Sequence, residues 1–143
     1  MDRDDLGFLL AKATQRWNEQ LHNRFRAAGW GHVRPSYGSI LVPLFEEDGL
    51  RMGELARRAH LSKQTMTTMV RLLEREGLVH RERDPADGRA FRVVLTAEAR
   101  RFEPVAERTL EELAVLAQQR LGERRLPIRP GTYVAGSSET PCR

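Results

Sequence analysis

Residues 52–96 read MGELARRAHLSKQTMTTMVRLLEREGLVHRERDPADGRAFRVVLT and carry the strongest structural signal in the chain. Their apolar spacing predicts, in order, a short helix, a tight turn, a second helix and two strands. A helix beside a two-stranded ribbon is an arrangement suited to gripping duplex DNA. The segment therefore predicts a winged helix-turn-helix.

The second helix is expected to follow Ser62, whose hydroxyl can accept a bond from a first-turn backbone N–H. Its apolar and small residues share one face at helical spacing: Met66, Met69, Val70, Leu73 and Gly77. The opposite face is polar, without a carboxylate at its centre: Gln64, Thr68, Arg71 and Arg75. This distribution predicts a helix that packs on one side and offers hydrogen-bonding groups on the other.

The polar face has the chemistry of base recognition. Glutamine can bond an adenine edge, arginine a guanine edge, and a threonine methyl can touch thymine, so we expect Gln64, Thr68 and Arg71 to read bases. The helix N-terminus favours phosphate, where Ser62, Lys63 and Thr67 are expected to hold the backbone. The alternative is a surface helix that happens to be basic.

The segments on either side favour DNA binding. Before the helix, Leu55, Ala56, Ala59 and Leu61 give a short helix an apolar face, and His60 falls in the turn. After Gly77, residues 78–83 and 90–95 have strand patterns, and the turn formers of residues 84–89 join them. Arg89 at this tip could enter a minor groove, held by a bidentate pair with Asp87. The alternative is a plain hairpin with a surface ion pair.

Together these residues resemble the MarR family of bacterial transcriptional regulators. The resemblance rests on Leu55-Ala56, Ser62-Lys63-Gln64, residues 73–79, Arg83, Asp87-Gly88-Arg89 and Leu95-Thr96. It implies a homodimeric repressor or activator, often released from DNA by a small phenolic or other aromatic ligand, and adds Arg83 to the expected DNA contacts. Two positions depart from the family pattern, Arg51 where a capping Thr or Ser is usual and Ala99 where a glycine is common.

We expect one mainly α domain over residues 1–121, with a small β-ribbon. Its DNA-binding lobe spans about 35–95, between dimerisation helices at about 5–28 and 97–121. The first helix has an apolar stripe: Leu6, Leu10, Ala13, Trp17, Leu21, Phe25 and Ala28. The second, capped by Thr96 and bent at Pro104, has another: Phe102, Ala106, Leu110, Leu113, Ala117 and Leu121. These stripes exceed what one lobe covers, which favours a homodimer on a near-palindromic operator with lobes roughly 34 Å apart.

A further helix is expected between Arg34 and Phe45, opened by Pro35 and kinked or shortened at Pro43. In MarR-like proteins an effector pocket lies between the dimer helices and the DNA-binding lobe. The resemblance implies that four residues border such a pocket here: Trp17, Trp30, His32 and Tyr37. The alternative is that Trp17 is core and Trp30 anchors a loop.

Residues 122–143 have no helical period, although the family would continue with another dimerisation helix. One hypothesis is a reading-frame change near Leu126, which would make this tail non-native. The alternative is a genuine short tail that packs across the dimer.

The composition agrees with a nucleic-acid partner, because the net charge is +4 and arginine supplies nearly all of the positive charge. No apolar run is long enough for a membrane span and no signal peptide is seen, so a cytoplasmic protein is expected. The histidines are too scattered for a zinc site, and no cofactor is expected. The alternatives are a winged helix that binds proteins without contacting DNA, or a redox sensor, which the lone Cys142 fits poorly; no catalytic grouping supports an enzyme.

Overall fold

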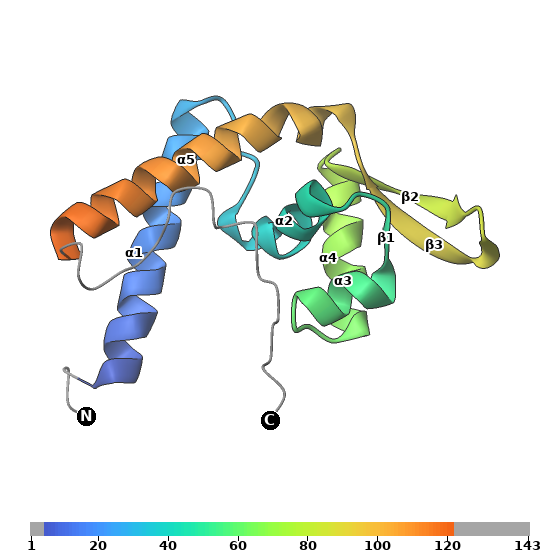
Figure 1. Ribbon diagram of the computed structural model, residues 1–143, viewed down its shortest axis with the longest axis horizontal. Helices are drawn as coiled ribbons and strands as arrows, with labels where there is room; N and C mark the ends of the chain where they lie inside the picture. The colour runs from blue at the N-terminus through green and yellow to red at the C-terminus, as the bar shows by residue number, and fades with distance from the viewer. Residues whose placement is uncertain (1–4, 122–143) are drawn as a thin grey trace, which may run out of the picture.

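The computed structural model describes residues 5–121 and is mainly helical, with a small antiparallel sheet, as expected. The elements in chain order are α1 (Leu6–Ala27), the 3-10 turn η1 (Pro35–Tyr37), α2 (Gly38–Glu46), β1 (Leu50–Arg51), α3 (Met52–Arg58), α4 (Lys63–Arg75), β2 (Val79–Asp84), β3 (Asp87–Leu95) and α5 (Ala97–Leu121). In Figure 1 the long helices α1 and α5 lie on one side, and α3, α4 and the β2–β3 hairpin form a lobe that projects from the other. The expected tail, 122–143, lies outside the described residues.

The helix-turn-helix forms as the sequence predicts. His60 makes the turn with a φ of 54°, a left-handed conformation that histidine adopts more readily than bulkier residues. Ser62 then caps α4, because its Oγ accepts the Thr65 backbone N–H at 3.1 Å. On the inner face of α4, Met66, Val70 and Leu73 are fully buried.

The sheet has three strands in the order β1-β3-β2, so the expected two-stranded ribbon was incomplete. The added strand β1 is only two residues long, with Leu50 opposite Val93 and Arg51 opposite Arg92. So short a strand has no period that a sequence pattern could reveal. The strands of the hairpin also extend closer to the tip than expected, since Asp84 pairs with Asp87.

Thr96 joins α5 to the end of α4. Its Oγ1 accepts the Ala99 backbone N–H at 3.2 Å, which confirms the expected cap, and donates to the Gly77 carbonyl at 2.7 Å. Gly77 directly follows Glu76, the C-cap of α4. Its φ is 74°, a conformation that would be strained in a residue with a side chain. A hydrogen bond therefore fixes the end of α4 to the start of α5.

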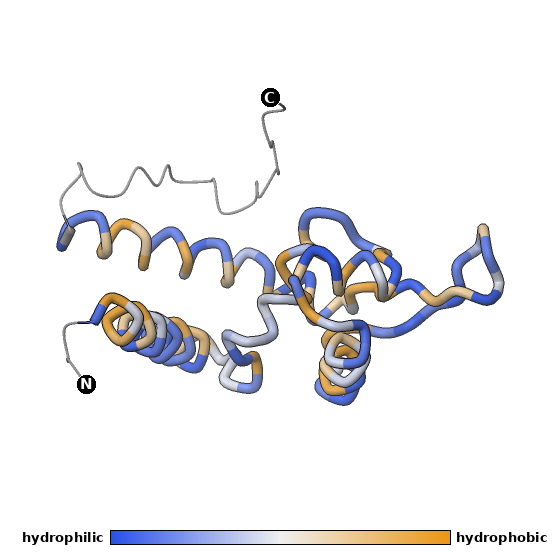
Figure 2. The backbone as a smooth tube through the Cα atoms, turned by 90° about the horizontal axis from the view of Figure 1, so that it is seen from below, coloured by the Kyte–Doolittle hydropathy of each residue, from blue (hydrophilic) through white to orange (hydrophobic). Residues whose placement is uncertain are grey.

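The core joins α2, α3, α4 and the sheet to α5 and to the end of α1 that packs on α5, but much of the α1 stripe is outside it. Leu21 and Phe25 are buried, whereas Leu6 and Leu10 at the other end are 69% and 59% exposed. Figure 2 shows apolar stretches along both α1 and α5 where the two helices extend beyond the lobe. The helix α2 contains Pro43 and ends three residues later at Glu46, as a shortened helix. None of the helices in residues 5–121 is long and apolar enough to cross a membrane.

Candidate nucleic-acid interface

Most cations of the lobe have an anionic or carbonyl partner within the chain. Arg51 donates to Asp84, Arg81 to Glu74, and Arg92 pairs with Glu82 at 3.6 Å. On α3, Arg57 donates to Glu54, and Arg58 donates both to Glu54 and to Glu47 at the end of α2. These guanidinium groups serve the fold and are less available to an external anion.

In four cationic residues of the lobe, the charged side-chain group has no hydrogen bond or ion pair with any of the residues that the structure describes: Lys63, Arg71, Arg75 and Arg89. Three of them lie on the exposed side of α4 and the fourth at the tip of the β2–β3 hairpin. An unpaired arginine needs no partner broken before it can bind a phosphate or a base edge. The free positive charge of the lobe is therefore concentrated on the two elements that a winged helix presents to DNA.

The expected base-reading side chains share the exposed face of α4. Gln64, Thr68 and Arg71 are all exposed, and Gln64 and Arg71 have no side-chain partner among residues 5–121. Thr68 donates its hydroxyl proton to the Gln64 carbonyl at 3.2 Å, a common bond of threonine within a helix. Its methyl group and oxygen lone pairs remain the groups it can offer to a base.

Two expected phosphate ligands are committed inside the helix instead. The Ser62 hydroxyl donates to Thr65 Oγ1 at 2.8 Å while it accepts the capping N–H. Thr67 is half-buried and donates to the Lys63 carbonyl at 2.8 Å. Of the three residues expected at this end, only Lys63 keeps its donors unused, so the prediction for Ser62 and Thr67 needs a change of hydroxyl orientation.

The expected pairing of Asp87 with the Arg89 guanidinium is wrong. Asp87 Oδ1 accepts the backbone N–H of Arg89 at 3.0 Å, and no ion pair joins the two side chains. A short aspartate side chain closes on the backbone two residues ahead more readily than on a long side chain. Asp87 thus shapes the tip and leaves the Arg89 guanidinium unpaired.

Arg83 faces its own hairpin. One of its terminal nitrogens donates to the Gly88 carbonyl at 2.8 Å, and its guanidinium carbon lies 5.6 Å from the centre of the Phe91 ring. Both contacts brace the tip, so Arg83 in this state supports the wing and is not a free ligand for DNA. Arg75, which we placed on the polar face of its helix but not among the expected contacts, is exposed and unpaired like Arg71.

Residues 35–91 match the model of the MarR family. This segment of the chain is similar to the MarR family. The regulator HosA of Escherichia coli O111:H- is 31% identical over 94 residues, which are 66% of this chain and 63% of HosA, so the chain spans less than two thirds of that relative. A probable transcriptional regulator of Pseudomonas aeruginosa matches 85% of this chain and 88% of its own, with a TM-score of 0.72 and 28% identity. PcaV of Streptomyces coelicolor, solved with its natural ligand, matches 85% and 82%, with a TM-score of 0.61 and 26% identity.

Outside the MarR-family match, α1 and the loop that follows it hold most of the residues expected to border an effector pocket. Tyr37 is buried, and Trp17 and Trp30 pack against the core. Trp30 lies 5.3 Å from Phe102 and 5.7 Å from His32, ring centre to ring centre. This packing agrees with the alternative in which Trp17 belongs to the core and Trp30 anchors a loop.

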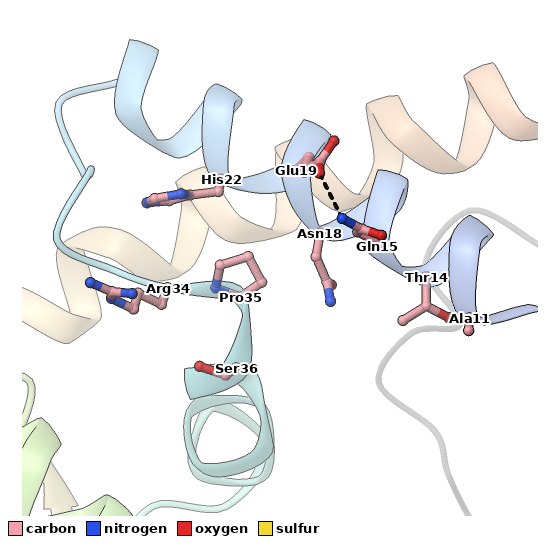
Figure 3. A pocket seen from close by; sticks show the side chains of 9 residues that line it. All are labelled: Ala11, Thr14, Gln15, Asn18, Glu19, His22, Arg34, Pro35 and Ser36. Carbon is pink, nitrogen blue, oxygen red and sulfur yellow. Dashed lines mark hydrogen bonds between the residues drawn. The ribbon is translucent and has the colours of Figure 1, made fainter.

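A groove of about 540 Å³ lies instead between α1 and η1, at the start of the segment that matches the MarR family. Figure 3 shows His22, Asn18 and Gln15 of α1 on one side of it, with Arg34 and Ser36 on the other. His22 Nε2 lies 2.9 Å from the Gly31 carbonyl, and the Arg34 guanidinium has no partner among the described residues. The sequence analysis did not predict this groove, because its lining is polar and the expected pocket was assigned to aromatic side chains. Residues 5–121 contain no group of three or more side chains able to hold a metal ion.

The hairpin also contains a nearly buried carboxylate. Asp84 is 8% exposed, and hydrogen bonds from the Ala86 backbone N–H and the Arg51 side chain hold its pKa below the ordinary value. A group whose pKa is lowered by folding stabilises the folded state at pH values above its pKa in the unfolded chain. This stabilisation is lost as the pH falls through its pKa in the folded protein.

We therefore expect Asp84→Asn to lower the free energy of unfolding at neutral pH by more than it does at acid pH. The difference from wild type should stay constant down to about pH 4 and narrow below it, because the wild-type carboxylate then becomes neutral too. Urea unfolding of both proteins across this pH range measures it. A difference that is the same at all pH values would mean that the charge of Asp84 contributes nothing.

Proposed function

We propose that the chain is a DNA-binding transcriptional regulator that acts as a homodimer on a near-palindromic operator. The observation that carries the proposal is the distribution of unpaired cations in the lobe, on the outer face of α4 and at the tip of the hairpin. In this mode α4 enters the major groove, where Gln64 and Arg71 reach base edges, and Arg89 enters the adjacent minor groove.

The dimer is supported by apolar side chains left uncovered on the long helices. Near the start of α1 the exposed fractions are 69% for Leu6, 48% for Leu9 and 59% for Leu10. Near the other end of α5, Val115 and Leu116 are 42% and 39% exposed. Large apolar residues left exposed on both long helices favour association. Sedimentation at micromolar concentration should give a dimer, and a monomer would remove this part of the proposal.

We further propose a small aromatic acid as the effector that releases the operator, in the groove between α1 and η1. Support comes from the unpaired Arg34 guanidinium, which suits a carboxylate, and from the groove's position between a dimer helix and the lobe. PcaV, a neighbour of similar fold, was solved with a natural ligand. The Arg34→Ala variant should then still bind DNA, but a higher concentration of a small aromatic acid such as salicylate should be needed to release it. If salicylate releases the variant and the wild type at the same concentration, this groove is not the effector site.

Arg71→Ala is expected to relax the sequence preference of the protein. An arginine bound to a guanine edge contributes about 1–3 kcal/mol of discrimination at that base pair, whereas a phosphate contact weakens all duplexes alike. Competition binding with duplexes that differ by one base pair measures the change.

The control is Arg57→Ala, because Arg57 is 76% exposed at its side chain and paired with Glu54 on α3. It should leave the preference intact. An Arg71→Ala protein that discriminates among bases as well as wild type would show that Arg71 does not read sequence. Unchanged binding in both Arg71→Ala and Arg89→Ala would favour the alternative of a protein-interaction module.

A further inference from the structure

Two ion pairs tie the wing, meaning the β2–β3 hairpin, to the helix-turn-helix. Arg81 of β2 pairs with Glu74 of α4 at 3.0 Å, and Asp84, closer to the tip, pairs with Arg51 from across the sheet. Asp84 Oδ2 accepts Arg51 Nε at 2.7 Å, and Asp84 Oδ1 accepts the Ala86 backbone N–H at 2.9 Å. The first bond leads to β1, and the second closes the tip of the hairpin. Both oxygens of one carboxylate are therefore in use, each by a different part of the lobe.

Asp84 lies where the hairpin changes direction. It is the last residue of β2, and the pairing with β3 is irregular between Arg83 and Asp84. An irregularity of this kind bends a strand and redirects the residues beyond it. The direction taken by the tip, and with it by Arg89, depends on what holds the chain at this point.

Arg51 holds it from across the sheet. Its backbone pairs with Arg92 of the central strand β3, and it directly precedes the first residue of α3. Glu82 of β2 lies opposite the same Arg92, so the Arg51 side chain passes the central strand and reaches toward the tip, to Asp84. The Arg51 side chain is 50% exposed and that of Asp84 10%, which makes the pair partly shielded from water.

We infer that Arg51 is a positioning residue for DNA binding, which holds the wing at a fixed angle to the helix-turn-helix through Asp84. This inference rests on the proposed function, because the wing matters only if Arg89 binds DNA. Arg51 touches no DNA in this role and acts through Arg89. Without the pair, the hairpin keeps its strands but loses its only side-chain tie to β1 among the ion pairs of the described residues.

The first test is a double-mutant cycle in duplex binding. Arg51→Met should lower affinity by about three- to tenfold in the wild-type background but by less than about twofold when Arg89→Ala is already present. Combined with Gln64→Ala, whose side chain lies on α4, its effect should stay at full size. Arg57→Met is the matched control, since it breaks an exposed ion pair on α3 that does not involve the wing.

An effect of Arg51→Met that persists in the Arg89→Ala background would overturn the inference, because Arg51 would then contact DNA directly or support the fold in general. An effect equal to that of Arg57→Met would overturn it as well. Thermal unfolding of each variant without DNA separates a loss of stability from a loss of positioning.

The second test needs no DNA and therefore survives failure of the proposed function. Spin labels on Gly53→Cys in α3 and Gly88→Cys at the tip, in a Cys142→Ser background, report the distance between helix and wing; a Cβ at either glycine meets nothing within 4 Å. Dilution with unlabelled protein removes distances between subunits. One narrow distance is expected in wild type and Arg57→Met, and a broadened or shifted one in Arg51→Met. The same distribution in all three would show that the pair does not position the wing.

Discussion

Replacing Phe102 with alanine should lower the free energy of unfolding by about 3–5 kcal/mol, the largest effect expected of any substitution considered for this chain. Phe102 lies in α5 and is 2% exposed. Its ring meets Phe25 of α1 edge-on, with centres 4.8 Å apart, and lies 5.3 Å from Trp30. Alanine would lose these contacts and leave a cavity where α1 and α5 join.

Urea unfolding at one fixed protein concentration measures this loss, because the stability of the proposed dimer would depend on concentration. The control is Phe91→Ala, the same change at a wing position that is 46% exposed, for which a loss of about 1 kcal/mol or less is expected. If the two substitutions cost the same, Phe102 does not hold the long helices together.

Arg89→Ala should weaken operator binding by about 1–3 kcal/mol and reduce the salt dependence of binding by about one unit of slope. The guanidinium is unpaired and exposed, and its backbone N–H is fixed by Asp87 at 3.0 Å, so the side chain starts from an ordered tip. A narrow minor groove attracts such a cation. Fluorescence anisotropy over a salt series gives both quantities.

The Arg83→Ala variant distinguishes the DNA contact of the tip from the contacts that hold the tip in place. It removes the bond to the Gly88 carbonyl and the contact with Phe91, so it should weaken binding through the wing without changing the salt slope. Wild-type affinity and slope in Arg89→Ala would contradict the proposed role of the wing.

The helices were predictable from the sequence because each has a local signal. Ser62 and Thr96 cap α4 and α5 through their own hydroxyls, and the apolar faces follow the helical period. The expected bounds of the long helices, 5–28 and 97–121, agree closely with Leu6–Ala27 and Ala97–Leu121.

The partners of polar side chains were not predictable, since they depend on residues far apart in the sequence. Nothing local links Arg51 to Asp84, 33 positions away, or brings Leu50 against Val93 to form a strand. The sequence suggests that Asp87 pairs with the Arg89 guanidinium, but its short side chain accepts the Arg89 backbone N–H instead. The sequence predicts the exposed polar face of α4 that we propose faces DNA, but it does not predict which of the side chains there are free of partners.

The most direct test of DNA binding is selection of duplexes from a random-sequence pool by the purified wild-type protein, at low and at near-physiological salt. The proposed regulator should enrich a near-palindrome with half-sites about one helical turn apart, and the enriched duplex should bind less tightly as salt rises. A dimeric sample that enriches no sequence would contradict the proposal that this winged helix recognises an operator.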